Sequence, residues 1–324
     1  MAEPIDHLYH RIDRTVSADP CTGVVRWSPA KSLWWTGALA TWLVVGSVHF
    51  SWSAVAVFLV STGVTLCLGH SIGMHRKLIH GGFDCPSWLE KVLVYLGTLV
   101  GLGGPFTMMR THDWRDWAQR QGQCHPFFSQ QRDIVTDAWW QLHCKIHLDR
   151  PPGYHFPAKL VSNGFFRFIE RTSMLQQIPI AILLFALGGW GWVAWGVCGR
   201  VAVSIFGHWL IGYFAHNTGH RDWHVNGAAV QGHNVPFCAL ITFGECWHNN
   251  HHAFPGSAKL GLFPRQFDPG WLVLRLLERV GLISNLRQPM SLPPHLGQMQ
   301  ARTLSPGSGQ IRASTASMPA QTRP

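Results

Sequence analysis

The apolar positions of this chain gather into long runs that are interrupted by short polar breaks. No residue in Ser32–Gly69 is charged, and this run is longer than the roughly 20 residues that one membrane-spanning helix needs. Polar residues in 47–53 divide the run. The pattern therefore predicts a hairpin of two spans, near residues 33–48 and 53–69.

A second hairpin is predicted near residues 176–188 and 193–215, with its turn in the glycine-rich segment 188–192. Neither turn contains Lys or Arg, whereas the segments that flank the hairpins do. The positive-inside rule then places both termini and the 70–172 region in the cytoplasm. The expected fold is all-α: an integral membrane protein of four transmembrane helices in two hairpins, with a cytoplasmic helical cap.

A third uncharged run, Val92–Met109, does not fit this topology as a span. If it crossed the membrane, His75 and His80 would lie on the opposite side from His112, and its glycines weaken a continuous helix. We expect a helix at the membrane interface instead. The expected organisation is a cytoplasmic N-terminal segment over 1–31 without a signal peptide, one domain over 32–285, and a disordered tail over 286–324.

Composition supports a membrane protein and narrows the kinds of partner. Charged residues make up only 13% of the chain and Trp occurs 17 times, a combination typical of membrane-interface anchoring. The eight Cys form no CxxC pair, which argues against a disulfide framework or a structural zinc site. The formal charge of +10 is better explained by topology and contact with anionic lipid than by nucleic acid.

Histidine is the residue that points to chemistry, with 20 copies in 324 residues. His248, His251 and His252 have the i, i+3, i+4 spacing that places side chains on one face of a short helix. Neutral imidazoles grouped in this way suit a transition metal such as iron, copper or zinc.

The surrounding segment, GECWHNNHHAFP over 244–255, resembles the last histidine box of the membrane fatty acid desaturases. The segment GMHRKLIH over 73–80 resembles the first box of that family, at the end of the second predicted span. Its His75 and His80 fall about 140° apart on an ideal α-helix. They can share a metal only if the helix ends or bends between them.

The second box departs from the family pattern HxxHH. His112 keeps the first imidazole, while Arg115 and Asp116 stand in the other two places. Arginine cannot bind a cation. Asp116 either replaces a lost imidazole as a carboxylate ligand or pairs with a neighbouring cation at the membrane surface. At the end of the fourth span, His216 matches a single family ligand, with Gly212 where the family has Asn.

The resemblance covers most of residues 33–285 and implies two non-haem irons per chain. The ligands it implies are His75, His80, His112, His216, His248, His251 and His252. Further side chains could bind metal or orient the ligands: His70, Asp116, His208 and His220, with Glu245 and Asp222 as possible acceptors. No catalytic residue beyond the metal ligands is expected.

The same resemblance implies an O₂-dependent desaturase that introduces a cis double bond into an acyl chain. The acyl carrier would be CoA, acyl carrier protein or phospholipid, and electrons would come from an external cytochrome b5 or ferredoxin. Membrane lipid is an expected partner and nucleic acid is not. The active site and both termini would face the cytoplasm.

Three other interpretations stay open from the sequence. A diiron hydroxylase or monooxygenase of the same fold would differ only after the first hydrogen abstraction. A membrane haem protein would need histidines in mid-span, whereas these clusters lie at span ends. The altered second box also allows a non-catalytic relic. Metal content separates the classes: about two irons per chain, haem, or neither.

Overall fold

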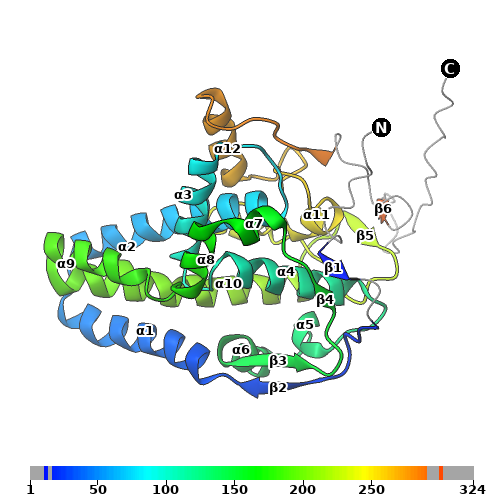
Figure 1. The fold of residues 1–324 in the computed structure, drawn as a ribbon, viewed down its shortest axis with the longest axis horizontal. Coiled ribbons are helices and arrows are strands. Elements are labelled where there is room, and N and C mark those ends of the chain that lie inside the picture. Colours follow the sequence, from blue (N-terminus) through cyan, green and yellow to red (C-terminus); the bar gives the residue numbers. More distant parts are fainter. Residues whose placement is uncertain (1–10, 14–16, 290–298, 302–324) are drawn as a thin grey trace.

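The computed structural model describes residues 11–13, 17–289 and 299–301. Long helices lie side by side in an antiparallel bundle, and shorter helices and loops gather at one end of it (Figure 1). The chain is mainly helical, as the sequence predicts. Most of the predicted C-terminal tail and the first ten residues of the N-terminal segment lie outside the described residues.

The first hairpin forms where the sequence predicts it. Helix α1 spans Pro29–Val48 and α2 spans Trp52–Val64. The turn between them ends at Ser51, whose hydroxyl accepts a hydrogen bond from the backbone N–H of Ala54 at 3.2 Å and so caps α2. Helix α2 continues without a break into a π-helix, η1, over Thr65–Ile79.

The second hairpin is formed by α9 (Gln177–Val193), the π-helical η2 (Ala194–Gly199) and α10 (Arg200–Asn217). The chain reverses at Gly189, whose φ of 68° is a left-handed conformation that favours glycine. The turn therefore lies in the predicted segment. Trp195 of η2 donates its indole N–H to the carbonyl of Gly46 at 3.0 Å, which joins the two hairpins.

Two stretches among the described residues are long and apolar enough to cross a membrane: Trp52–Ile79 and Gln177–Asn217. The second contains the reversal at Gly189, so it forms both arms of a hairpin. Neither stretch includes α1 or Val92–Met109.

The expectation of one interfacial helix over Val92–Met109 is wrong in one respect, because the run is split between two helices. Helix α3 spans Ser87–Thr98 and α4 spans Pro105–Arg120. Gly101 and Gly103, in the connection between them, have φ values of 93° and 138° that favour glycine. Pro105 provides a favourable first residue for α4.

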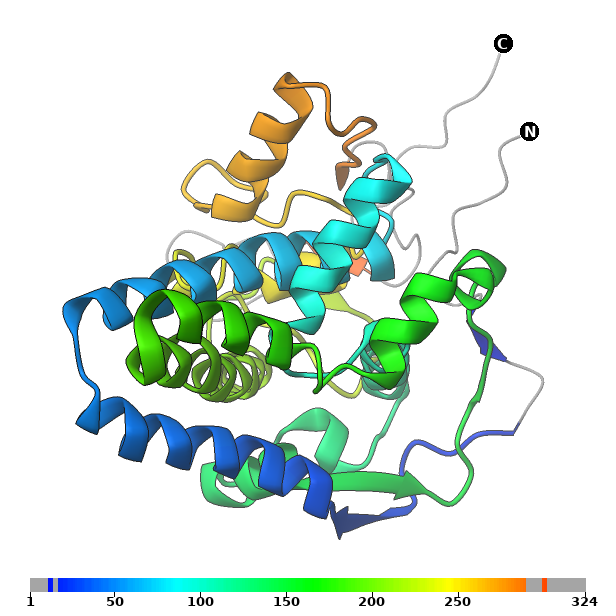
Figure 2. The ribbon, with the colours of Figure 1, turned by 60° about the vertical axis from the view of Figure 1, so that its left-hand side comes forward.

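Helix α3 packs closely against η1. A Cβ on Gly69 would lie 2.4 Å from the backbone nitrogen of Gly97, so only glycine permits this approach. Further along, Phe83, Leu93 and Leu274 share a buried apolar cluster that also joins helix α12, over Pro269–Arg279. Both α3 and α12 run across the direction of the long helices (Figures 1 and 2).

The remaining elements lie around the end of the bundle at which the shorter helices and loops gather. The helices are α5 (Pro126–Ser129), α6 (Ile134–His143), α7 (Ala158–Ser162), α8 (Gly164–Arg171), the 3₁₀ turn η3 (Pro236–Cys238) and α11 (His248–Ala253). Within the part of the chain that the structure describes, the strands form three antiparallel pairs: β1 (Ile12–Asp13) with β4 (Gly153–Tyr154), β2 (Gly23–Trp27) with β3 (Cys144–Leu148), and β5 (Trp223–Val225) with β6 (Met299–Ala301). Strand β6 falls within the segment that the sequence predicts to be a disordered tail.

Candidate metal centre

Seven histidines form two groups that could each hold a metal ion. In the first group, one nitrogen from each of four imidazoles lies within 4.8 Å of the others, and the second group brings three imidazoles together in the same way. The groups are His75, His80, His112 and His251, and His216, His248 and His252. These are the seven residues that the sequence predicts as ligands.

The π-helical conformation of η1 brings His75 and His80 together. The backbone N–H of His80 donates to the carbonyl of His75 at 3.1 Å, the i to i+5 bond that defines a π-helix. Residues five apart then lie nearly one above the other, and the two ring centroids are 4.7 Å apart. The sequence predicts a helix end or bend here. A wider helical turn achieves the same result.

Helix α11 divides its three histidines between the two groups. His251 turns toward the first group, with its ring centroid 4.5 Å from that of His75. His248 and His252, one turn apart, form the second group with His216. Their Nε2 atoms are 2.9 Å apart, and Nε2 of His248 is also 2.9 Å from Nε2 of His216.

Side-chain amides hold α11 in place. The Oδ1 atom of Asn234 accepts the backbone N–H groups of Asn249 and Asn250, at 3.0 and 3.4 Å, so it serves as the N-terminal cap of this helix. The amide of Asn250 donates to the carbonyl of Leu260 at 2.8 Å. Both asparagines of the box are buried, and their side chains hydrogen-bond to the adjacent loops, Asn249 at Trp223 and Gly232 and Asn250 at Leu260 and Gln266.

Two acceptors fix which ring nitrogen faces each group. Glu245 places Oε2 2.6 Å from Nδ1 of His75, and Gln130 places Oε1 3.0 Å from Nδ1 of His216. Each acceptor favours a proton on Nδ1, which leaves the Nε2 lone pair for a metal. The sequence predicts Glu245 as a possible acceptor. Gln130 was missed, because no motif marks a residue so distant in sequence from its histidine.

Burial favours the neutral form of several of these imidazoles. Desolvation, reinforced by His75 and His112, lowers the pKa of His248 to about 3. Desolvation, with help from neighbouring imidazoles, also holds the pKa of His80, His251 and His252 well below its usual value. When both nitrogens carry a lone pair rather than a proton, nitrogens about 3 Å apart repel one another unless a cation lies between them, and first-row metals bind imidazole at about 2.0–2.1 Å. The donor set therefore fits transition-metal ions.

A buried ion network joins the first histidine box to the third. Burial opposes the charge of Glu245, but His75 and Arg76 outweigh it and hold the pKa of this carboxyl well below its usual range. Arg76 is fully buried and makes two bonds to Asp268, at 2.9 and 3.2 Å, and one to the carbonyl of Phe243. Sequence analysis missed Arg76 and Asp268, since neither residue has ligand chemistry.

The two altered positions of the second box face other partners. Arg115 donates to Gln130 at 2.9 Å and to Gln141 at 2.7 Å. Asp116 accepts from Nε of Arg120 at 3.0 Å and belongs to neither histidine group. Nε2 of Gln119, one turn further along α4, lies 3.2 Å from Nε2 of His216. Arg115 and His216 thus share the side-chain oxygen of Gln130.

The other candidate residues lie around the groups. His70 and His208 form a pair of their own, with ring centroids 4.9 Å apart. His220 is exposed and lies 2.8 Å from Asp222, because α10 ends at Asn217 before its helical face could reach that far. Neither His70, His208 nor His220 supplies a nitrogen to the two groups.

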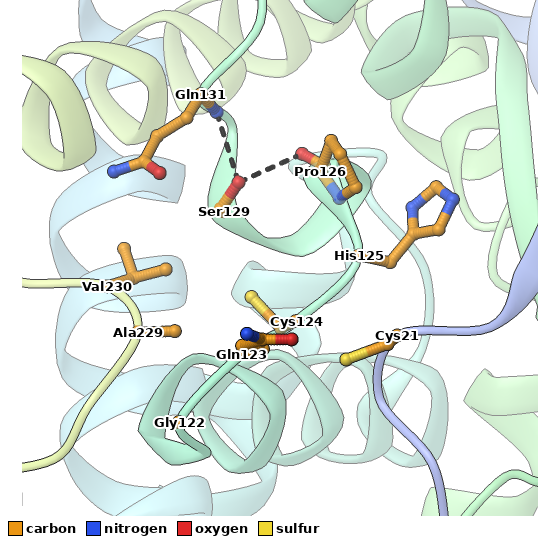
Figure 3. A pocket seen from close by; sticks show the side chains of 10 residues that line it. All are labelled: Cys21, Gly122, Gln123, Cys124, His125, Pro126, Ser129, Gln131, Ala229 and Val230. Atoms are coloured by element: carbon orange, nitrogen blue, oxygen red, sulfur yellow. Dashed lines mark hydrogen bonds between the residues drawn. The ribbon is translucent and has the colours of Figure 1, made fainter.

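A pocket of about 350 Å³ lies at the end of α4, away from the histidines. Its lining includes Cys21, Cys124, Gln131 and Val230 (Figure 3). Burial raises the pKa of both thiols, to about 11 for Cys124. They stay protonated near neutral pH, and the pocket lacks the chemistry of the histidine groups.

Comparison with known proteins agrees with this site. The sequence profile of the fatty acid desaturase family matches residues 50–258. The chain is 33% identical over 249 residues to an sn-1 stearoyl-lipid 9-desaturase of Anabaena variabilis, covering 74% of this chain and 86% of that relative. It is 32% identical over 251 residues to an icosanoyl-CoA 5-desaturase of Limnanthes douglasii, covering 74% and 67%. The chain therefore belongs to the fatty acid desaturase family, and it is an oxidoreductase that desaturates fatty acyl chains.

Proposed function

We propose that this chain introduces a cis double bond into a saturated acyl chain at a two-iron centre held by its seven clustered histidines. The observation that carries the proposal is the pair of adjacent, largely buried histidine groups, with four and three imidazoles. The rings of His248 and His251 are 5.8 Å apart, so one short helix links the groups.

Bound iron would supply the oxidising power that no amino-acid side chain has, since hydrogen must be removed from unactivated methylene carbons while O₂ is reduced to water. The protein contributes orientation. Glu245 and Gln130 hold the imidazoles of His75 and His216 with Nε2 toward the groups. Burial lowers the pKa of His80, His216, His248, His251 and His252, so protons compete less with the metal at these ligands.

Four membrane spans are proposed: α1, α2 with the start of η1, α9, and η2 with the first part of α10. Exposed apolar side chains support this topology, for example Val44 (65% exposed), Val60 (67%) and Ile182 (65%). Both hairpin turns lie at the same end of the bundle, opposite α11 (Figure 1). The histidine groups and both termini would then face the cytoplasm.

The partners follow from the family. Relatives named for stearoyl-lipid and icosanoyl-CoA substrates support an acyl chain carried by phospholipid, CoA or acyl carrier protein. An external cytochrome b5 or ferredoxin would deliver the electrons, and membrane lipid would surround the spans. We assign the seven histidines as ligands. His70 and His208 would order the surroundings of the centre, and Asp116 would bind metal only after leaving Arg120.

The altered second box favours one competing function, a diiron hydroxylase on the same fold. The second histidine group of this chain holds only three imidazoles. A changed set of metal ligands would alter the outcome after the first hydrogen abstraction. The product separates the two functions: a hydroxylase yields a hydroxy-acyl chain, and a desaturase yields an alkene.

Lipid profiling of cells that express the full chain tests the proposal. Fatty acid methyl esters should show a new double bond at one position, together with iron in the purified protein. His251→Ala should abolish the product, whereas His147→Ala, on an exposed strand residue, should leave it unchanged. If cells that express the wild-type chain form no new double bonds, and the purified protein contains no iron, the chain is a non-catalytic relic.

A further inference from the structure

Asp113 is a buried carboxylate that the ligand assignment does not use. Its exposed fraction is only 3%, and it follows His112 directly in α4. One oxygen, Oδ1, lies 3.6 Å from Nδ1 of that histidine. A buried carboxylate must be paired and hydrogen-bonded to remain charged, so its partners show what it does.

Arg11 is the main partner of Asp113, and it comes from the N-terminal segment, 102 residues earlier in the chain. Its Nε donates to Oδ2 at 2.5 Å and its Nη2 to Oδ1 at 2.9 Å, the bidentate geometry of a strong charge-assisted pair. Its third nitrogen, Nη1, donates to the carbonyl of Ile79 at 3.0 Å. The guanidinium of Arg11 thus hydrogen-bonds to both α4 and η1.

Tyr154 completes the arrangement and explains how Arg11 is positioned. Its hydroxyl donates to Oδ2 of Asp113 at 2.6 Å. Strand β1 pairs with β4 so that Ile12 lies opposite Tyr154, and the backbone N–H of His155 donates to the carbonyl of Arg11 at 2.8 Å. Docking of β1 on β4 therefore delivers both side chains to the same carboxylate.

The two anchoring points are the immediate neighbours of two ligand histidines. Ile79 precedes His80 at the end of η1, and Asp113 follows His112 in α4. The Nε2 atoms of these histidines are 3.3 Å apart, although they come from separate helices. The second box retains only one imidazole, that of His112. Residues that are not metal ligands must therefore help to hold His112 beside His80.

Arg11 and Tyr154 together match the buried charge of Asp113. Both donate hydrogen bonds to its carboxylate oxygens, at 2.5 to 2.9 Å. Arg11 and Asp113 cancel each other's charge, so the arrangement adds no net charge beside the histidine group. Its effect is on position.

We propose that Arg11, Asp113 and Tyr154 form a clamp that sets the separation of His80 and His112, so that the N-terminal strand controls how tightly the four-histidine group binds metal. The inference rests on the proposed function, because it takes these histidines as ligands. Arg11, Asp113 and Tyr154 are positioning residues and touch neither substrate nor metal.

Metal binding by the full-length chain in detergent tests the clamp. Co²⁺ is titrated into the metal-free protein, and its visible absorption reports the occupancy and coordination of each group. Asp113→Asn and Arg11→Met should weaken one of the two Co²⁺ sites by about 10- to 100-fold, the usual effect of losing a group that orients a ligand. The other site should keep its wild-type affinity and spectrum.

Conservative variants and a control separate positioning from general damage. Arg11→Lys keeps the charge without the bidentate geometry, so it should restore part of the affinity. Tyr154→Phe should weaken the same site less than Asp113→Asn does. Arg150→Met is the matched control, because it breaks a 3.2 Å pair with Asp19 near the same N-terminal segment and should change neither site.

The possible outcomes decide the matter. Wild-type Co²⁺ affinity and spectrum in Asp113→Asn and Arg11→Met would overturn the clamp alone, provided that the wild type binds two ions and desaturates. If Asp113→Asn does not fold, Tyr154→Phe and Arg11→Lys take its place, and unchanged binding in both overturns the clamp. A wild-type chain that binds no ion at either site overturns the proposed function and the clamp together.

Discussion

His248 and His251 lie one turn apart in α11, yet their rings contribute to different histidine groups. His248 approaches His216, with their Nε2 atoms 2.9 Å apart, while the ring of His251 lies 4.7 Å from that of His80. Helix α11 therefore lies between two prospective metal sites and contributes histidines to both. Any shift of α11 moves a ligand of both sites, which explains why Asn234 caps this short helix so closely.

The division of α11 predicts different losses for its two adjacent histidines. His251→Ala should empty the four-histidine group, and His252→Ala should empty the three-histidine group. Each variant should retain about one metal per chain and lose desaturation. Co²⁺ spectra of the two variants should differ from each other and should sum approximately to the wild-type spectrum. Identical spectra would contradict the division.

Glu245→Gln should impair the metal centre more than the fold. The variant keeps the shape of the side chain but weakens its hold on Nδ1 of His75, while Arg76 retains Asp268. We expect metal affinity or turnover to fall by about 10- to 100-fold. The measurement is iron content together with kcat, compared with the thermal unfolding midpoint. A large loss of stability with normal iron content would show that Glu245 acts mainly on the fold.

Asp268→Asn should show the opposite balance. Arg76 would lose the charge of its bidentate partner while fully buried, and breaking a buried pair of this kind costs about 3–5 kcal/mol of unfolding free energy. Denaturant unfolding in detergent measures the loss. An unchanged midpoint would mean that the carbonyls of Phe243 and Ala258 suffice for Arg76.

Asp116→Asn should leave metal content unchanged. Asp116 accepts from Arg120 rather than from the space between the histidines, and Arg120 also donates to the carbonyl of His252. The expected effect is a modest loss of stability, about 1–3 kcal/mol, from a weakened buried hydrogen bond. Loss of one metal in this variant, with the fold intact, would establish Asp116 as a ligand.

Burial of the ligand histidines makes a prediction about pH. At pH 6 an ordinary imidazole of pKa about 6.5 is roughly three-quarters protonated, so four of them would release about three protons on binding metal. With the pKa of His248 near 3 and that of His80, His251 and His252 well below 6.5, these four ligands together should release fewer than three protons. Titration in weak buffer with a pH indicator measures this number.

The same pKa shifts set the sign for stability. Below about pH 6.5 the unfolded chain binds protons at these histidines and the folded, metal-free chain does not. The free energy of unfolding should therefore decrease as the pH falls from about 6.5 toward 3, and these groups should contribute no pH dependence above that range. Unfolding curves of metal-free protein between pH 5 and pH 8 provide the check.

The sequence predicts the helical class, both hairpins and all seven clustered histidines, because these depend on composition and on local spacing. It does not predict the π-helix that brings His75 and His80 together, since that conformation depends on packing of η1 against α3. Arg11, Gln130 and Asp268 were also missed. Their partners are distant in sequence, and only the folded chain shows that a guanidinium or an amide lies beside a ligand.

The second box shows most clearly what the sequence alone does not predict. Substitution of two imidazoles by Arg115 and Asp116 is visible in the sequence, but the consequence is not. In the folded chain Arg115 turns to Gln130 and Gln141, and Asp116 turns to Arg120. In the proposed two-iron centre, the three-histidine group would bind metal with fewer histidine ligands than the four-histidine group.

The iron content of the purified full-length chain tests the central claim most directly. The protein is loaded with Fe²⁺ under anaerobic conditions, freed of excess metal and assayed for iron and chain concentration. It should contain about two irons per chain, and a chelator should first remove the iron of the three-histidine group. One iron or fewer per chain in a folded protein that still desaturates acyl chains would contradict a two-iron centre held by these seven histidines.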